Sequence, residues 1–249
     1  PDLDEAVAEL PGGARMGSLF HYIFENIDFD IVMTGPEAIL DHGPHAILVD
    51  EALARFRIDP KWRVQIAERV AAVLRTPMDL DGETLILGHL SPDARQHEVE
   101  FFFPATRPGD FGDTVAQNTM IRGFIDLLIE WKGKFYIADW KSNRLADGYS
   151  QAAMAAEMAE AGYDLQYQIY TVAMLRWLKQ VRGGGFDPNR HFGGALYFFI
   201  RGMKPGSQDG VFHVPPDLLL PLSRLDEKLY ALLSGQRNRE SQAKPERLS

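Results

Sequence analysis

Two acidic residues and a lysine near the middle of the chain are of the types that hydrolytic metal centres use. Asp126 follows Gly-Phe-Ile, and Asp139 and Lys141 flank a single tryptophan. Two carboxylates at one site either share a proton or hold a cation. A hard divalent ion such as Mg²⁺ takes oxygen ligands from one or two carboxylates together with substrate phosphates. A lysine at its edge would orient or deprotonate a water and stabilise developing charge, which is the chemistry of phosphodiester hydrolysis.

A β-hairpin is the element that would position these side chains. Residues 121–130 and 134–140 are rich in β-branched and aromatic residues, and the Lys-Gly pair between them is a hairpin turn signal. We therefore expect two antiparallel strands joined by a two-residue turn.

The register of this hairpin decides whether the acids meet. With a two-residue turn, Trp131 lies opposite Lys134, and the same register places Asp126 directly across from Asp139. Cross-strand partners have Cβ atoms about 4.5 to 5.5 Å apart. Lys141 projects from the same face as Asp139, and the tryptophan between them points the other way. The sequence thus predicts that two carboxylates and an ammonium converge.

Apolar residues are expected on both faces of the hairpin. This pattern predicts central strands covered on both sides, where unpaired charges are costly. The expected sets are Phe124, Leu128 and Ile137 on the face of the acids, and Ile125, Leu127, Ala138 and Trp140 on the other.

Composition bounds the class of protein. The chain has 249 residues and 45% hydrophobic content, with no run long enough to cross a bilayer, so we expect one globular domain, or one with a helical appendage, and no membrane contact. It contains no cysteine, which excludes disulfides, thiolate zinc sites and cysteine-ligated iron-sulfur clusters and is compatible with a reducing cytoplasm. A start at Pro1 favours a segment of a longer polypeptide.

The net charge of −9 argues against a surface that coats nucleic acid, because phosphate affinity is carried mainly by lysine and arginine. Any DNA contact must therefore be local. Lys132, Lys134, Lys141 and Arg144 are expected to cluster around the site.

The remaining pattern predicts a helical N-terminal part over 1–95, a core over 96–235 and a polar, disordered tail over 236–249. Helices are expected at 17–29, 46–56, 62–74, 150–161, 163–180 and 216–233, and further strands at 97–103 and 194–201.

The order of these elements resembles the core of the restriction-endonuclease-like PD-(D/E)xK fold, an α/β fold with a mixed central sheet flanked by helices. Within that fold the chain resembles the C-terminal nuclease domains of the RecB family, the β subunits of exodeoxyribonuclease V, from about residue 17 to about residue 233. The matching motifs occur in the expected order at 17–21, 99–101, 123–126, 139–143, 151–155, 163–170 and 191–194.

This resemblance implies a set of functional residues. The metal ligands would be His21, Asp126, Asp139 and the backbone carbonyl of Trp140, and Lys141 would be catalytic. The metal would be one or two Mg²⁺ ions, for which Ca²⁺ or Mn²⁺ substitute in a crystal.

Three further residues match the family pattern. Glu100 corresponds to an acid that holds a water on the metal or a second ion. Gln166 and Tyr170 match a Gln-xxx-Tyr motif, and their i, i+4 spacing puts both on one helix face, suited to contacting the DNA backbone or supporting the lysine.

The resemblance also implies partners and a place of action. It implies a DNA nuclease in the bacterial cytoplasm that processes single strands and duplex ends, with RecC-like and RecD-like subunits and the RecA recombinase. No Walker motif occurs in the sequence, so this chain by itself lacks the ATPase motor.

Two alternatives stay open at this point. One is a nuclease-fold module that has lost catalysis and docks recombinase or sister subunits. The other is a two-carboxylate glycosidase, which needs acids about 5 to 9.5 Å apart and no metal.

Overall fold

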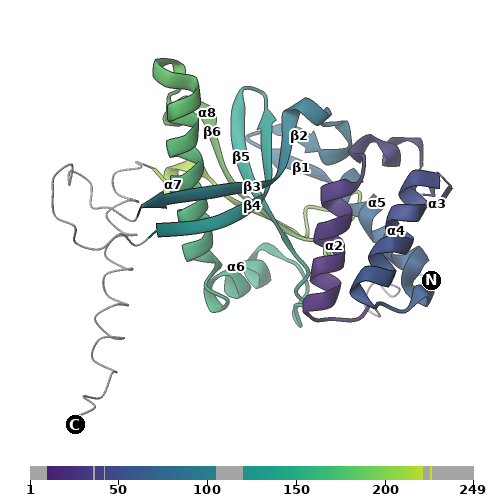
Figure 1. The fold of residues 1–249 in the computed structure, drawn as a ribbon. Coiled ribbons are helices and arrows are strands. Elements are labelled where there is room, and N and C mark those ends of the chain that lie inside the picture. The colour runs from purple at the N-terminus through teal and green to yellow at the C-terminus, as the bar shows by residue number, and fades with distance from the viewer. Residues whose placement is uncertain (1–9, 36, 42, 105–119, 221–224, 226–249) are drawn as a thin grey trace, which may run out of the picture.

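A five-stranded mixed sheet lies at the centre of the computed structural model, which describes residues 10–35, 37–41, 43–104, 120–220 and 225 (Figure 1). The strand order is β3-β4-β5-β6-β7, with β5 and β6 parallel and the other neighbours antiparallel. The strands are β3 (Arg95–Pro104), β4 (Met120–Trp131), β5 (Lys134–Lys141), β6 (Phe192–Phe199) and β7 (Val211–Val214). The predicted α/β architecture is confirmed.

The N-terminal part packs helices against one face of this sheet (Figure 1). The three predicted helices are present, with bounds shifted by up to three residues. The helices are α2 (Ala14–Asn26), α3 (Ala38–Asp41), α4 (Gly43–Phe56) and α5 (Arg63–Arg75), with 3₁₀ turns η1 (Phe29–Thr34), η2 (Pro60–Trp62), η3 (Leu87–His89) and η4 (Pro92–Ala94).

A small hairpin of β1 (Pro77–Leu80) and β2 (Glu83–Ile86) interrupts this helical part and was not anticipated. Its turn residues Asp81 and Gly82 have φ of 57° and 80°, the left-handed values of a type I′ turn. Four-residue strands are too short to show a clear periodicity, so the turn was the one usable signal.

The opposite face of the sheet carries α7, next to α6. The elements here are α6 (Gln151–Glu160), α7 (Tyr163–Arg182), η5 (Gly183–Gly185), α8 (Pro188–His191) and η6 (Pro216–Leu218). Of the helix predicted over 216–233, the structure shows η6 at its start, and most of the remainder and the predicted tail lie outside the described residues.

The hairpin register predicted from the two-residue turn is confirmed. The paired positions run from Trp131 with Lys134 to Leu127 with Ala138. Lys132 and Gly133 at the turn both have positive φ, 52° and 74°, as a type I′ turn requires. The ladder ends at Leu127 and Ala138, one position before Asp126 and Asp139.

Apolar clusters cover both faces of β4 and β5, as expected, but the division of residues between them differs. Leu127, Ala138 and Trp140 pack toward α2, α4 and α5. Ile125, predicted on that side, instead packs with Leu128 on the α7 side. Phe124, predicted to share the face of Leu128, is exposed. The strict alternation of the strand therefore breaks between Ile125 and Leu127, at Asp126.

No described helix is both long enough and apolar enough to cross a membrane.

Candidate metal centre

Helix α2 brings His21 to the sheet. Its buried face includes Leu19, Ile23 and Phe24, and the Phe24 ring stacks on Trp140 with centroids 4.2 Å apart and planes 16° apart. The Trp140 side chain thus points toward α2, away from Asp139 and Lys141, as the strand period predicts.

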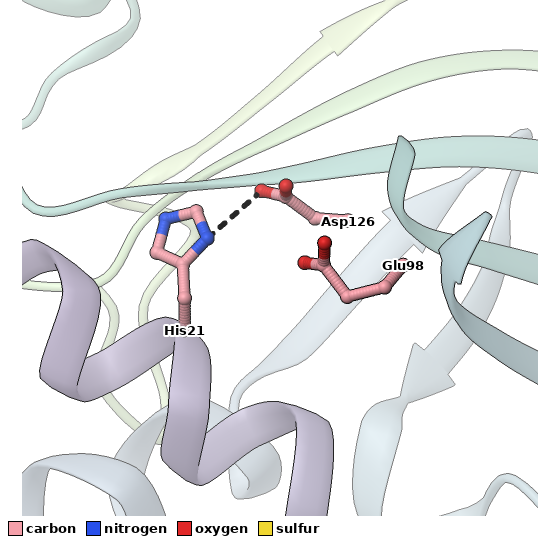
Figure 2. A group of neighbouring side chains, drawn as sticks. All are labelled: His21, Glu98 and Asp126. Atoms are coloured by element: carbon pink, nitrogen blue, oxygen red, sulfur yellow. Dashed lines mark ion pairs between the residues drawn. The ribbon is translucent and has the colours of Figure 1, made fainter. Parts of the chain in front are cut away.

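The backbone of Trp140 joins two of the candidate ligands. Its carbonyl oxygen lies 3.0 Å from His21 Nε2, and its N–H donates to Asp126 Oδ2 at 2.9 Å. The same Asp126 oxygen lies 3.5 Å from His21 Nδ1 (Figure 2). The carbonyl expected to bind metal is therefore at the site, with one of its two lone pairs toward the imidazole.

The Trp140 contact fixes the tautomer of His21. Burial lowers the pKa of His21, partly opposed by the charge of Asp139, so the ring is neutral at pH 7. A neutral imidazole bonds a carbonyl through its N–H, which assigns the proton to Nε2. Nδ1 then carries the free lone pair, faces Asp126 and can bind a cation. Its partner Nε2–H is held by a carbonyl oxygen, as in many metal sites.

Asp139 and Lys141 form a buried ion pair on the α7 side of β5. Asp139 Oδ2 lies 2.6 Å from Lys141 Nζ, with side chains 4% and 10% exposed. The Lys141 ammonium also lies 3.9 Å from the centroid of the Tyr163 ring. Breaking a buried pair by removing one partner costs about 3 to 5 kcal/mol, so these two residues depend on each other.

Gln166 connects this pair to helix α7. Its Nε2 donates to Asp139 Oδ1 at 3.0 Å and to the Tyr170 hydroxyl at 2.9 Å. Its Oε1 accepts from Lys141 Nζ at 3.0 Å and from the Tyr197 hydroxyl at 3.2 Å. The reversed amide would turn its donor toward the ammonium and its acceptor toward the carboxylate, so electrostatics allows one orientation only.

The position of Tyr170 depends on a glycine. Phe101 lies across Gly123, its partner on β4, and its ring meets Tyr170 edge-on with centroids 5.7 Å apart. A Cβ on Gly123 would lie 2.5 Å from Phe101 Cζ, so this glycine of the Gly-Phe-Ile-Asp motif leaves room for the ring that supports Tyr170.

Strand β3 contributes an acid that sequence reasoning missed. The β3–β4 ladder pairs His97 with Leu127 and Val99 with Ile125, but the pair between them, Glu98 with Asp126, is absent from it. Glu98 has φ of 48°, a left-handed conformation that costs a non-glycine residue about 1 to 2 kcal/mol. Such strain gathers at functional sites. Only the register of β3 against β4 would have indicated Glu98. The sequence does not fix that register, because residues 105–119, and not a two-residue turn, connect the two strands.

Three ligand atoms converge at this irregularity. His21, Glu98 and Asp126 each offer one atom, and these atoms lie within 4.8 Å of one another (Figure 2). Asp139 is not part of this close group, although its charge acts on Asp126 across the hairpin. Glu98, and not the predicted Glu100, is therefore the β3 acid in this close group.

Glu100 itself lies elsewhere. It is an exposed residue on β3, and its Oε1 accepts from Arg122 Nε at 2.7 Å. The predicted basic cluster is also wrong in part. Lys132 and Lys134 sit at the hairpin turn, about 17 Å along the strand from Asp139, and pair with Glu83 and Asp81 of the β1–β2 hairpin.

Without a cation, the site disfavours the charged form of its carboxyl groups. Burial, reinforced by the charge of Asp139, raises the pKa of Asp126 to about 8. Burial also raises the pKa of Asp139, although Lys141 opposes the shift, and the pKa of Glu98 moves in the same direction. A divalent cation would relieve all three, and a donor set of carboxylate oxygens and one imidazole, with no sulfur, suits Mg²⁺ or Mn²⁺. The residues therefore fit a metal.

Comparison with known proteins agrees with this geometry. The family model of the PD-(D/E)XK nuclease superfamily matches residues 3–248. The chain belongs to the PD-(D/E)XK nuclease superfamily. Membership makes it a nuclease of a superfamily whose members generally depend on divalent metal ions.

The relatives of this PD-(D/E)XK domain carry the name "RecBCD enzyme subunit RecB". The Escherichia coli K12 protein is 34% identical over 242 residues, covering 88% of this chain and 19% of the relative. The Mycobacterium tuberculosis H37Rv protein is 29% identical over 271 residues, covering 90% and 24%. The chain thus spans about a fifth to a quarter of these relatives. The resemblance to the RecB family is confirmed.

Proposed function

We propose that this PD-(D/E)XK domain hydrolyses phosphodiester bonds of DNA with Mg²⁺, as the nuclease part of a RecBCD-type helicase-nuclease that processes double-strand ends for recombination and repair. The observation that carries the proposal is the group of His21, Glu98 and Asp126 ligand atoms beside the Trp140 backbone, next to the Asp139–Lys141 pair that Gln166 holds.

The ligands come from four elements, α2, β3, β4 and β5. His21 Nδ1 from α2 and the carboxylates of Asp126 and Asp139 from the hairpin would hold the cation, together with the Trp140 carbonyl. Glu98 completes the group from β3. A bound Mg²⁺ would polarise a phosphoryl oxygen and lower the pKa of a coordinated water.

Lys141 is the catalytic cation. Its ammonium is confined between Asp139, the Gln166 amide and the Tyr163 ring, so it cannot swing away as a surface lysine would. There it would orient the attacking water and stabilise the negative charge that develops on the phosphoryl oxygens. Gln166 and Tyr170 act as positioning residues, because Gln166 binds Asp139 and Lys141 with opposite ends of one amide.

The relatives' printed name, RecBCD enzyme subunit RecB, supports RecC-like and RecD-like subunits as partners. We propose that the chain works in a complex with RecC-like and RecD-like subunits in the bacterial cytoplasm, on single strands and duplex ends, and that RecA is a further partner. An assembly explains how an acidic chain works on DNA, since other subunits would supply most of the strand binding.

Cleavage of single-stranded DNA by the purified domain tests the function. We expect cleavage with Mg²⁺, complete inhibition by EDTA, and loss of activity in Asp139→Ala. Glu130→Gln, which changes a half-exposed acid on the same hairpin, is the matched control and should cleave normally. Cleavage that persists in EDTA would instead support metal-free, glycosidase-type chemistry.

The competing candidate is an inactive docking module. It predicts that calorimetry detects no Mg²⁺ binding and that the wild-type domain does not cleave DNA. The buried Asp139–Lys141 pair speaks against it, because an apolar replacement would be as stable or more so if the pair had no chemical role.

A further inference from the structure

The irregularity at Glu98 and Asp126 changes which residues of β3 and β4 face α2. On one side of it, His97 and Leu127 face the α2 side, and His97 packs edge-on against Phe29. Beyond it, Phe101 and Phe103 contact α7 through Tyr170 and Arg176. The residues that alternate with Phe101 and Phe103 along β3, and their partners on β4, therefore face the opposite side of the sheet. This is the side of the metal group, which consists of His21, Glu98 and Asp126.

These alternate residues form an exposed aromatic face. Glu100 pairs with Phe124 and Phe102 pairs with Arg122. Phe124 is 43% exposed and Phe102 is 63% exposed, which is unusual for phenylalanine. Along the strands, Phe124 lies about 7 Å from Asp126 and Phe102 lies about 13 Å from Glu98. The aromatic face therefore extends away from the metal group.

A cation accompanies the two rings. The Arg122 guanidinium lies 6.0 Å from the centroid of the Phe124 ring and 2.7 Å from Glu100. Sequence-tolerant binding of single strands uses this combination, aromatic rings that stack on bases and arginines beside the backbone.

A cleft continues the surface on the other side of the metal group. It measures about 430 Å³, and its lining includes Ala14, Gly17 and Ser18 of α2, His21, Arg55 and Glu98. Small residues keep this cleft open beside the helix. The Arg55 guanidinium stacks over Tyr22 at 4.7 Å from its centroid, an arrangement that holds it ready for a phosphate.

We propose that a single strand of DNA crosses the metal group between these two surfaces, with its backbone in the cleft near Arg55 and its bases stacked on Phe124 and Phe102. This inference rests on the proposed function and adds the path of the substrate. It also explains how a chain of net charge −9 contacts DNA locally.

The Glu100–Arg122 pair allows a test in which a substitution should strengthen DNA binding and not weaken it. A strand on this face must approach the Glu100 carboxylate, which also engages the arginine. Glu100→Gln should therefore bind single-stranded DNA more tightly, by about threefold to tenfold, without loss of cleavage. If Glu100 were a metal-site acid, the same variant would cleave poorly.

The main experiment measures binding and cleavage separately. Binding of a labelled 12-nucleotide oligo-dT is followed by fluorescence anisotropy with Ca²⁺, and KM and kcat are measured with Mg²⁺. Phe102→Ala/Phe124→Ala should raise Kd and KM by roughly 10-fold to 100-fold, since stacking contributes substantially per base, and change kcat by less than about threefold. Leu218→Ala, which removes an exposed apolar side chain of η6, is the control and should bind as wild type.

An abasic oligomer of equal length distinguishes stacking from general adhesion. Wild type should bind it as weakly as the double variant binds oligo-dT, and the double variant should not discriminate between the two oligomers. Arg55→Gln should weaken binding and reduce the salt slope by about one, whereas Arg57→Gln, outside the cleft lining, should not.

The outcomes separate the two proposals. Unchanged binding of oligo-dT by the double variant overturns the path even if the wild type cleaves DNA. A wild type that binds oligo-dT through Phe102 and Phe124 but never cleaves it supports the path and overturns the nuclease function. Circular dichroism confirms that the variants, whose changes are on the surface, remain folded.

Discussion

The Lys141 ammonium lies 2.6 Å from the Asp139 carboxylate, and both side chains are nearly buried on a central strand. Neither charge would be tolerated there without the other. The pair therefore couples the stability of the sheet to the residues proposed for catalysis.

A double-mutant cycle tests this coupling. Without metal, Lys141→Met and Asp139→Asn should each destabilise the protein, the lysine variant by about 3 to 5 kcal/mol, because it leaves a buried carboxylate unpaired. The double variant should be less destabilised than the sum of the two, by about 1 to 3 kcal/mol. Urea unfolding measures these free energies, and strict additivity would contradict the pairing.

The Gln166 amide is expected to act on kcat rather than on substrate binding. Gln166→Leu keeps the volume but removes four hydrogen bonds, two of which orient Asp139 and Lys141. We expect kcat to fall by about 10-fold to 100-fold with KM within threefold, because a misplaced catalytic group raises the barrier without changing binding. Gln180→Leu on the exposed end of the same helix is the control. A rise in KM alone would place Gln166 in DNA binding.

Metal binding should depend on pH through Asp126. Because burial and Asp139 raise its pKa to about 8, this carboxyl is mostly protonated at pH 6 without metal, and a cation must displace the proton. Apparent Mg²⁺ affinity should rise between about pH 6 and 8 and level off above, with proton release seen by calorimetry in buffers of different ionisation enthalpy. Affinity that stays constant over this interval would contradict the shift.

Glu98 and Glu100 differ in their expected contribution to metal affinity. Glu98→Gln should weaken Mn²⁺ binding by about tenfold or more, since Glu98 lies in the group with His21 and Asp126. Glu100→Gln should leave it unchanged, since that carboxylate binds Arg122. Titration calorimetry on both variants measures these Mn²⁺ affinities. A larger loss of affinity in Glu100→Gln than in Glu98→Gln would support the sequence-based assignment of Glu100 to the metal site.

The comparison of these two glutamates shows how far sequence reasoning reaches. Local rules were sufficient for the hairpin, because a type I′ turn with Lys132 and Gly133 fixes the register of the ladder as far as Leu127 and Ala138, one position before Asp126 and Asp139. They failed at Glu98, since a left-handed residue in mid-strand breaks the period of two on which face assignments depend. The same break moved Ile125 to the α7 side.

Sequence spacing also could not predict the side-chain positions that depend on contacts between distant residues. The i, i+4 relation of Gln166 and Tyr170 was visible in the sequence, but the direction of the Gln166 amide depends on two strand residues at least 25 positions away. The position of His21 likewise depends on Phe24 stacking on Trp140. Family resemblance named these residues, and packing explains their placement.

Anomalous diffraction from a Mn²⁺-soaked crystal tests the central claim most directly. We expect a peak bonded to His21 Nδ1 and to carboxylate oxygens of Asp126 and Asp139, with oxygen distances of about 2.0 to 2.3 Å, and with Glu98 bonded directly or through water. A protein that cleaves DNA with Mn²⁺ while the crystal shows no peak among these residues, or a peak bound only elsewhere, would contradict the account.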